Sequence, residues 1–295
     1  MIRKFILSII FIANDNINTY RMSKVTLSSK SNTFFSCSDK EHRSVEANIA
    51  EHVLIHIYSG SLSVTDSNGA HLINEGGTAL LCKNMLAKFI KYPSKAGMFK
   101  SVAIAFTRPF LLGYYAENKS IQQSTPHWGV HKINEHPLLT SLFVSLIPYN
   151  EIQGDTIPEP LTTIKLQEAI TVIRTVDLEV DGLLNNFSEQ GKIDLVDYMQ
   201  RHYSFNVSIA KFANLTGRSL ATFKRDFQKA FRTSPQKWLL EKRLMEAHYL
   251  ITQGNKRPSE IYLEVGFENL SHFSRSFKQH FGYNPSSIEV SRIEK

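Results

Sequence analysis

The stretch Phe223-Lys224-Arg225-Asp226-Phe227 decides the fold of the C-terminal part of this chain, because its pattern continues to Phe231 and Pro235 and then recurs. The full pattern, F-x-R-x-F-x-x-x-F-x-x-x-P, returns 50 positions later, at 273–285. Phenylalanines at i, i+4 and i+8 share one face of a helix and point into a core. The arginine lies about 200° around the helix from the first phenylalanine, so it is expected to point outward.

Each copy follows an apolar-patterned segment that ends in a glycine, 209–217 before the first and 261–266 before the second. A short helix, a turn with glycine and a second helix with an outward basic face form the layout of a helix-turn-helix. One copy alone is weak evidence, because phenylalanine at helical spacing is core in most all-α domains. The duplication, with the same arginine and the same final proline, predicts two DNA-reading helices in one chain.

The positive charge of the chain lies in the part that carries the repeat. The formal charge of the 295 residues is +7. Residues 191–295 hold 17 Lys and Arg against 10 Asp and Glu, whereas residues 1–190 hold 17 of each. A basic part beside a neutral part indicates a polyanionic partner for the basic part, although an ordinary solvated surface can carry the same excess. Two cysteines without zinc spacing indicate no disulfide framework, so a reduced, cytoplasmic setting is expected.

Residues 1–24 are expected to be a disordered tail or an over-called start, because Met22-Ser23-Lys24 resembles an ordinary protein start. Arg3 and Lys4 precede the apolar run 5–13, which faintly resembles a signal peptide. That run is too short to cross a bilayer, so no membrane is expected among the partners.

Residues 25–187 are predicted to form a first domain of strands followed by helices. Strand-like segments recur every 8–12 residues over 25–108, which is typical of a small antiparallel barrel or sandwich. Within them Asp66-Ser67-Asn68-Gly69 predicts a hairpin whose Asn-Gly pair supplies two positive-φ positions. Amphipathic helices are expected over 138–146 and 161–176, with more apolar surface than one packing face requires. They either form a dimer interface or pack on the barrel.

Residues 188–295 are predicted to be all-helical, with seven helices after a short linker. The long helix opened by Ser234-Pro235 and running to Thr252 spans about 27 Å. Neighbouring major grooves on one face of B-DNA lie about 34 Å apart, so this helix can hold two recognition helices in adjacent grooves. The other expected helix caps are Asn206, Ser219, Ser259 and Asn269.

At these residues the chain resembles the AraC/XylS family of bacterial transcription regulators, and within it most resembles the branch containing ExsA. The resemblance covers about the last hundred residues. It departs from the family pattern at Arg232, where glycine is usual, at Tyr262, where a small residue is usual, and at Gly77-Thr78. The motifs that carry it are Ile209-Ala210, Thr216-Gly217-Arg218-Ser219, Phe223 to Phe227, Ser234-Pro235, Arg243-Leu244, Ala247, Gly266 to Lys278, Phe281-Gly282 and Asn284-Pro285.

The resemblance implies an α+β chain: an N-terminal cupin-like antiparallel β-barrel with a helical hairpin, and a C-terminal all-α domain with two helix-turn-helix motifs. It implies a sequence-specific regulator of transcription that binds double-stranded DNA and works with RNA polymerase. Control is expected through the N-terminal domain, by a small effector or a protein antagonist, in a possible homodimer. No cofactor is expected, and activation and repression both stay open.

The candidate DNA-contacting residues lie on the stripes opposite the phenylalanines. Arginine suits bidentate contact with guanine, small side chains permit close approach, and helix N-termini favour phosphate. The alternative role for Arg225 is a salt bridge to Glu241 or another neighbour. The alternative for His272 is that its ring is a partly buried filler. The base-reading candidates are Ala221, Lys224, Arg225, Ser271, His272, Ser274 and Arg275. The phosphate candidates are Lys211, Arg218, Ser219, Gln228, Lys237, Asn269 and Lys278.

A metal-dependent cupin enzyme is the alternative from another class. Cupin-type barrels bind metal through histidines and a carboxylate, and His42, His52, His56 and His71 lie in the barrel-like part, with Glu51 and Glu75 nearby. The H-x-H…E…H spacing of such sites is missing, so neither a metal site nor catalytic residues are expected.

Overall fold

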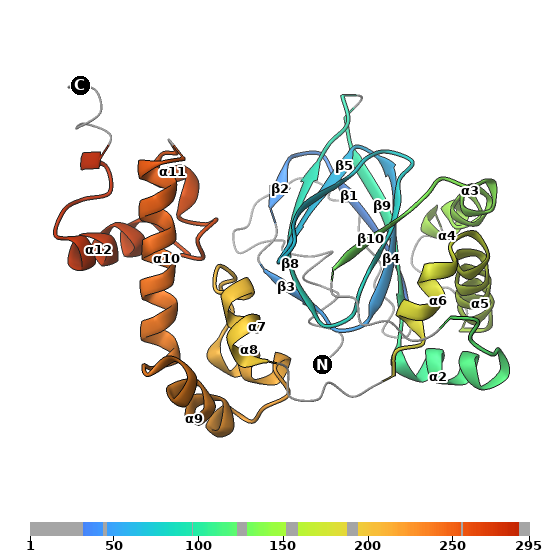
Figure 1. Ribbon diagram of the computed structural model, residues 1–295. Helices are drawn as coiled ribbons and strands as arrows, with labels where there is room; N and C mark the ends of the chain where they lie inside the picture. The colour runs from blue at the N-terminus through green and yellow to red at the C-terminus, as the bar shows by residue number, and fades with distance from the viewer. Residues whose placement is uncertain are drawn as a thin grey trace. The chain divides into compact units, whose positions relative to one another are not determined.

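The computed structural model describes residues 32–43, 46–95, 97–122, 129–151, 159–187, 194–254 and 256–288. The expectation for residues 1–24 therefore lies outside the described residues. The chain divides into two compact units, an N-terminal unit of residues 1–187 and a C-terminal unit of residues 188–295 (Figure 1). The predicted antiparallel β-domain with added helices, followed by an all-helical domain, is confirmed.

Two antiparallel sheets build the N-terminal unit. One sheet has the order β1-β9-β4-β7-β10, and the other has the order β2-β8-β5-β6 with β3 also pairing with β8. The strands are β1 (Thr33–Ser38), β2 (His42–Arg43), β3 (Ala47–Ile49), β4 (His52–Ser59), β5 (Ser61–Asp66), β6 (Gly69–Ile73), β7 (Thr78–Leu81), β8 (Met85–Tyr92), β9 (Phe99–Phe106) and β10 (Val130–Ile133).

The burial of each strand follows from what covers its two faces. β5 alternates between half-buried and buried residues, as a strand does when only one face meets a core. β4 is buried at nearly every position of its first half, because its inner face meets the core between the sheets and its outer face meets helices. Two cores result: Ile55 and Ile57 lie in the inner one, and Leu54 lies in the outer one.

Helices cover the outer face of the five-stranded sheet (Figure 1). The longest, α5, buries Leu166, Ala169, Ile170 and Ile173 in the outer core. Packing on the barrel, one of the two roles expected for the helix over 161–176, is thus confirmed. The helices of this unit are α2 (Arg108–Glu117), α3 (Pro137–Val144), α4 (Ile147–Glu151), α5 (Glu159–Val176) and α6 (Leu178–Leu184).

The hairpin between β5 and β6 is confirmed, and of its two predicted positive-φ positions Gly69 is confirmed with φ 127°, whereas Asn68 is wrong. Asp66 pairs with Gly69, so Ser67 and Asn68 are the two loop residues. Among the described non-glycine residues only Asn84 and Arg232 have a positive φ, so Asn68 does not. The Asp66 side chain accepts a hydrogen bond of 2.7 Å from the Asn68 backbone N–H and fixes the turn in another way.

Helices, most of them short, make up the C-terminal unit. No helix among the described residues of either unit is long and apolar enough to span a bilayer. Of the predicted caps, Ser219, Ser234 and Asn269 are confirmed. Asn206 and Ser259 are wrong, because Ser208 and Arg257 precede those helices. The predicted seventh helix falls at the end of the described residues, of which 287–288 are helical. The others are α7 (Leu195–His202), α8 (Ile209–Leu215), α9 (Leu220–Phe231), α10 (Pro235–Thr252), α11 (Pro258–Ile261) and α12 (Leu270–Phe281).

The residue that closes α9 is Arg232, and it adopts a left-handed conformation with φ 57°. Gly282 closes α12 at the matching position of the second copy with φ 86°. Glycine takes this conformation without strain, whereas a residue with a Cβ pays about 1–2 kcal/mol. Arg232 therefore adopts a backbone conformation that favours glycine, the residue that is usual at this position in the family.

Replacing Arg232 by glycine should raise the free energy of unfolding by about 0.5–1 kcal/mol, after the larger chain entropy of glycine is subtracted. Gly282→Ala is the matched opposite change and should lower it by about 1 kcal/mol. Chemical denaturation of the purified variants measures both effects. A destabilised Arg232→Gly variant would show that the arginine side chain stabilises the turn by more than the backbone strain costs.

Candidate nucleic-acid interface

Buried phenylalanines fix the two helices that carry the repeated motif. Phe223 and Phe227 on α9, and Phe273 and Phe277 on α12, are completely buried, as the spacing predicted. Around α9 the aromatic contacts reach the next helix, since the Phe227 ring meets the Trp238 ring of α10 at 5.7 Å between centroids. With the aromatic face buried in each case, the opposite face of the helix is left to solvent.

The open face of α9 carries the first set of predicted contact residues. Ala221, Lys224, Arg225 and Gln228 are all exposed. The Arg225 side chain is 66% exposed, and its Nε lies 3.8 Å from Asp226 Oδ1. The alternative role, a salt bridge to Glu241 or another neighbour, is met among the described residues only by this weak contact with Asp226. A guanidinium that exposed, with so loose an ion pair, is available to a partner.

The open face of α12 carries the second set. Ser271, His272, Arg275 and Lys278 are exposed, and Ser274 is half-buried. The His272 ring lies 5.5 Å from the Phe267 ring but remains exposed, so it is not a buried filler. The two exposed stripes match position by position across the 50-residue repeat.

Ser219 and Asn269 begin the two helices. The Ser219 hydroxyl accepts a hydrogen bond of 3.2 Å from the Thr222 backbone N–H. The Asn269 side-chain oxygen accepts one of 2.8 Å from His272 N–H. Both side chains are therefore used as caps, while the remaining N–H groups of each first turn and the helix dipole still favour an anion there.

Two of the predicted phosphate contacts point toward the protein itself. The Arg218 side chain is only 9% exposed, with Nε 3.2 Å from Asp226 Oδ2 and Nη1 donating to the Thr216 carbonyl at 2.8 Å. Lys211 is half-buried, and burial lowers the pKa of its ammonium. Lys237 by contrast is 70% exposed and lies 3.9 Å from Glu241.

Arg243 belongs to the motifs that carry the family resemblance, but the sequence alone predicts no role for it. The structure places it between the two helix-turn-helix motifs of the C-terminal unit. Its guanidinium donates to three backbone carbonyls: Tyr203 at 2.8 Å, Phe205 at 2.9 Å and Gly266 at 3.0 Å. The first two precede α8, and the third precedes α12. One side chain of α10 thus joins the entry of the first helix-turn-helix to that of the second.

Gly266 makes this contact possible. Its φ is +94°, and a Cβ there would lie 2.6 Å from the Ser204 carbonyl oxygen and 2.8 Å from Arg243 Nε. A second hydrogen bond joins the segment before α8 to the segment before α12, because Asn206 Nδ2 donates to Glu268 Oε1 at 3.0 Å. The signal for Arg243 was present in the sequence: it stands at i+4 from Leu239 and i−4 from Ala247, both buried, so it interrupts an apolar face.

Within the C-terminal unit α9 lies at the lower end of α10, and α12 lies beside the upper half of α10 (Figure 1). α10 has 18 residues, as predicted, and so is about 27 Å long. Its first half buries Trp238 and Leu239, and its second half buries Leu244 and Ala247. One rigid helix therefore belongs to both helix-turn-helix cores.

The histidines of the N-terminal unit do not gather into a site. His56 stacks on Phe143 with centroids 4.2 Å apart, and burial lowers its pKa to about 4. His52 is also buried, which lowers its pKa to about 3, while His71 contacts Asp66 at 3.2 Å. Among the described residues no group of three His, Cys, Asp or Glu could hold a metal ion.

Comparison with known proteins gives a match in each unit. Residues 212–289 match the family model described as "Helix-turn-helix domain". Residues 52–174 match the one described as "ExsA N-terminal regulatory domain". The two models together cover most of the described chain.

Three individual proteins illustrate the likeness. The thermoregulatory protein LcrF of Yersinia pestis is 28% identical over 165 residues, which are 54% of this chain and 59% of LcrF. The regulator ExsA of Pseudomonas aeruginosa is 22% identical over 241 residues, covering 81% of this chain and 86% of ExsA. An apo form of ToxT from Vibrio cholerae superposes with a TM-score of 0.44 at 14% identity, covering 87% of this chain and 96% of ToxT. The chain thus spans 59% of the length of LcrF, and the same share of two VirF activators of Yersinia enterocolitica.

Truncating Arg243 to alanine should lower the free energy of unfolding of the C-terminal unit by about 3 kcal/mol or more, because three carbonyls lose a charged donor. Arg243→Lys should recover little, since one ammonium cannot reproduce the planar fork. Lys237→Ala, on the exposed face of the same helix, is the matched control and should change the value by less than about 0.5 kcal/mol. Thermal and urea unfolding measure the loss, and an Arg243→Ala variant as stable as the control would refute the role.

Proposed function

The chain belongs to the AraC family of helix-turn-helix transcription regulators, and from this premise we propose that it binds double-stranded DNA with α9 and α12 in adjacent major grooves. Its family consists of regulators and not of enzymes. The observation that carries the proposal is the pair of exposed stripes at the two ends of α10, each backed by buried phenylalanines. Both stripes hold an arginine at the same position of the repeat.

Base reading falls to the exposed side chains of the two stripes. Arg225 and Arg275 each present a guanidinium that can donate two hydrogen bonds to O6 and N7 of guanine. Ala221 and Ser271 leave room for close approach at the start of each helix. Lys224, His272 and Ser274 flank them and complete the base-reading set.

Phosphate contacts position the protein on the duplex. Lys237, Gln228 and Lys278 are exposed beside the stripes, and the N-termini capped by Ser219 and Asn269 offer backbone N–H groups. Arg218 acts mainly through Asp226, by holding the turn before α9, and half-buried Lys211 contributes less than the exposed lysines. Affinity then comes chiefly from phosphate neutralisation, and sequence preference from the two stripes.

The proposal predicts that some substitutions change the DNA sequence preference, whereas others weaken binding to all DNA sequences. Selection from a random duplex pool by the purified chain should yield one bipartite site. On that site Arg225→Ala and Arg275→Ala should each lose about 1–3 kcal/mol of binding free energy and relax the preference at one base pair. Lys237→Ala should weaken binding to all sequences and reduce the salt slope by about one unit.

Arg201→Ala is the control, because Arg201 is an exposed arginine of the same unit that lies outside both stripes and pairs with Asp197. It should bind the selected site as the wild type does. Equal losses on selected and random DNA for the two stripe variants would contradict base reading, and a pool without enrichment would contradict the function itself.

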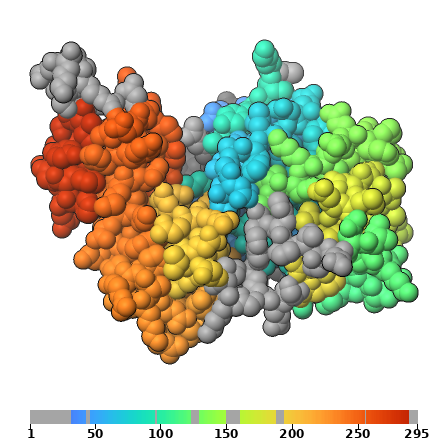
Figure 2. Space-filling model, in the orientation of Figure 1, coloured from blue at the N-terminus to red at the C-terminus, as the bar shows by residue number. Residues whose placement is uncertain are grey.

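Control of transcription would pass through the N-terminal unit, by a small effector or a protein antagonist, with RNA polymerase as the further partner at the promoter. A homodimer through α5 is a second element of the proposal. Beside the residues that α5 buries in the outer core, it exposes Leu161 by 40% and Ile164 by 56%. In Figure 2 the yellow-green helices of the N-terminal unit form part of the surface of that unit. Apolar side chains on such a surface fit a symmetric contact.

Placing a charge on that surface should separate the subunits. Ile164→Glu is expected to shift the chain toward the monomer, because an isologous contact brings two such charges together. Thr175→Glu, exposed near the other end of α5, is the control and should leave the oligomeric state unchanged. Sedimentation velocity over a concentration series measures the shift. A wild type that stays monomeric at all concentrations would rule out this interface.

A further inference from the structure

We propose that Asp226 is a positioning residue for DNA sequence recognition, because its carboxylate joins a base-reading arginine of α9 to a nearly buried arginine of the preceding turn. Asp226 Oδ2 accepts a hydrogen bond of 3.2 Å from Nε of Arg218. Asp226 Oδ1 lies 3.8 Å from Nε of Arg225. The inference rests on the proposed function, since it assigns Asp226 a part in the base reading by Arg225.

The Arg218 end of this network is fixed to the protein. The Arg218 side chain is only 9% exposed, and its Nη1 donates to the carbonyl of Thr216 at 2.8 Å. Thr216 is completely buried, and its hydroxyl donates to the Phe212 carbonyl of α8 at 2.9 Å. A guanidinium held in this way offers its donors in a defined direction, because it is planar and rigid. Arg218 therefore holds the Asp226 carboxylate from one side.

The Arg225 end of the network is loose, as a side chain that still has to bind DNA requires. The Arg225 side chain is mostly exposed, and the Asp226 carboxylate faces its Nε. Asp226 thus leaves the four N–H groups of the two Nη atoms for a partner. Two of these groups can donate to O6 and N7 of one guanine. Asp226 limits the orientations of Arg225 before DNA binds, which reduces the entropy that base reading costs.

The second copy of the motif forms its helix without this network. Ser276 stands at the position of Asp226, 50 residues later, and both residues are half-buried. In the part of the chain that the structure describes, no Asp or Glu lies within ion-pair distance of Arg275. Of the two stripe arginines, Arg225 is thus the one that a carboxylate directs. A serine at position 226 should accordingly be compatible with the helix.

A carboxylate at this place acts against DNA binding in general. Asp226 follows Arg225 directly on α9, and its side chain is partly exposed. DNA phosphates repel its negative charge whatever the base sequence is. The preference for one base pair and the affinity for all DNA should therefore respond to the loss of this charge with opposite signs. A residue that only stabilises the fold would change both in the same direction.

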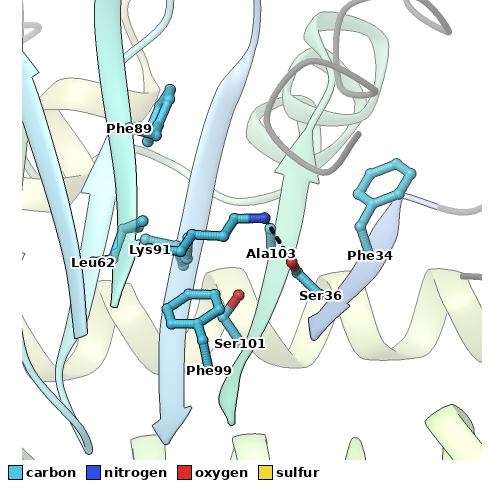
Figure 3. A pocket seen from close by; sticks show the side chains of 9 residues that line it. Phe34, Ser36, Leu62, Phe89, Lys91, Phe99, Ser101 and Ala103 are labelled. Carbon is cyan, nitrogen blue, oxygen red and sulfur yellow. Dashed lines mark hydrogen bonds between the residues drawn. The ribbon is translucent and has the colours of Figure 1, made fainter. Parts of the chain in front are cut away.

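Two other charged side chains show what a purely structural charge does. Lys91 donates to Ser36 Oγ at 2.7 Å between the two sheets of the N-terminal unit, and so joins β8 to β1 (Figure 3). Asp181 accepts a hydrogen bond of 2.7 Å from the Ile121 backbone N–H, and so joins α6 to the segment after α2. Both bonds lie inside the N-terminal unit. Asp226 differs from both, because one of its two arginines belongs to the base-reading set.

The test measures binding of the full chain to the selected duplex, to its single-base-pair variants and to a random duplex. The base pair read by Arg225 is the one at which Arg225→Ala relaxes the preference. Asp226→Asn keeps the shape of the side chain and removes its charge. It should lower the preference at that base pair about threefold or more, while the affinity for random DNA rises about twofold. The preference at the base pair read by Arg275 should stay unchanged.

Asp197→Asn is the matched control, because Asp197 is an exposed carboxylate of the same unit that pairs with Arg201 outside both stripes. It should leave the preference at both base pairs unchanged. Asp226→Ser gives the first copy the residue of the second copy and should act as Asp226→Asn does. In an Arg225→Ala background, Asp226→Asn should cause no further loss of preference at that base pair, because the two residues act through one contact. Circular dichroism shows which variants are folded, and Asp226→Ser decides if Asp226→Asn is not.

Three results would contradict the inference, and they separate it from the proposed function. An unchanged preference at the Arg225 base pair in a folded Asp226→Asn or Asp226→Ser variant would overturn the inference alone. Equal losses at all base pairs, or a lower preference together with weaker binding to random DNA, would assign Asp226 a structural role and also overturn the inference alone. A pool without an enriched site, or an Arg225→Ala variant without a relaxed base pair, would overturn base reading by Arg225 and this inference together.

Discussion

The geometry of the C-terminal unit depends on one guanidinium inside it. Arg243 stands on the apolar face of α10 and donates to the carbonyls of Tyr203, Phe205 and Gly266. A partly buried charge of this kind is stabilised when its donors are satisfied, and here the acceptors come from both helix-turn-helix motifs. The two motifs are therefore fixed to one helix and to each other by the same side chain. The spacing between the recognition helices then follows from the length of α10.

Duplication explains why the two recognition helices look alike, and local chemistry explains where they differ. Both helices bury two phenylalanines completely, and both expose an arginine on the opposite face. At the end of the second copy Gly282 takes the left-handed conformation freely, while at the end of the first copy Arg232 is held in it. Each stripe has two cationic side chains, Lys224 and Arg225 on α9 and Arg275 and Lys278 on α12, but the α12 stripe adds two serines and a histidine. The two halves of a bipartite DNA site would accordingly have different sequences.

The sequence predicted most of the fold, because its signals were local. Helical phenylalanine spacing located α9 and α12. Ser219, Ser234 and Asn269 marked their beginnings and that of α10, and the Asn-Gly pair of Asp66-Ser67-Asn68-Gly69 located the β5–β6 hairpin. Signals that depend on distant partners were missed. The cap at Asn206 was wrong because the Ser208 side chain caps α8 and Asn206 instead donates to Glu268. The cap at Ser259 was wrong because α11 begins one residue earlier, at Pro258. The exposure of the candidate contact residues agreed with the helical pattern, but the inward turn of Arg218 toward Asp226 could not be read from spacing alone.

The central claim is that two recognition helices bind one DNA duplex from the same side. Methylation interference on the selected DNA site tests this most directly, because dimethyl sulfate modifies guanine N7 in the major groove. We expect two clusters of interfering guanines on the same face, their centres about one helical turn, or roughly 10 base pairs, apart. One cluster only, or interference spread without phase along the duplex, would contradict the geometry set by α10 and Arg243.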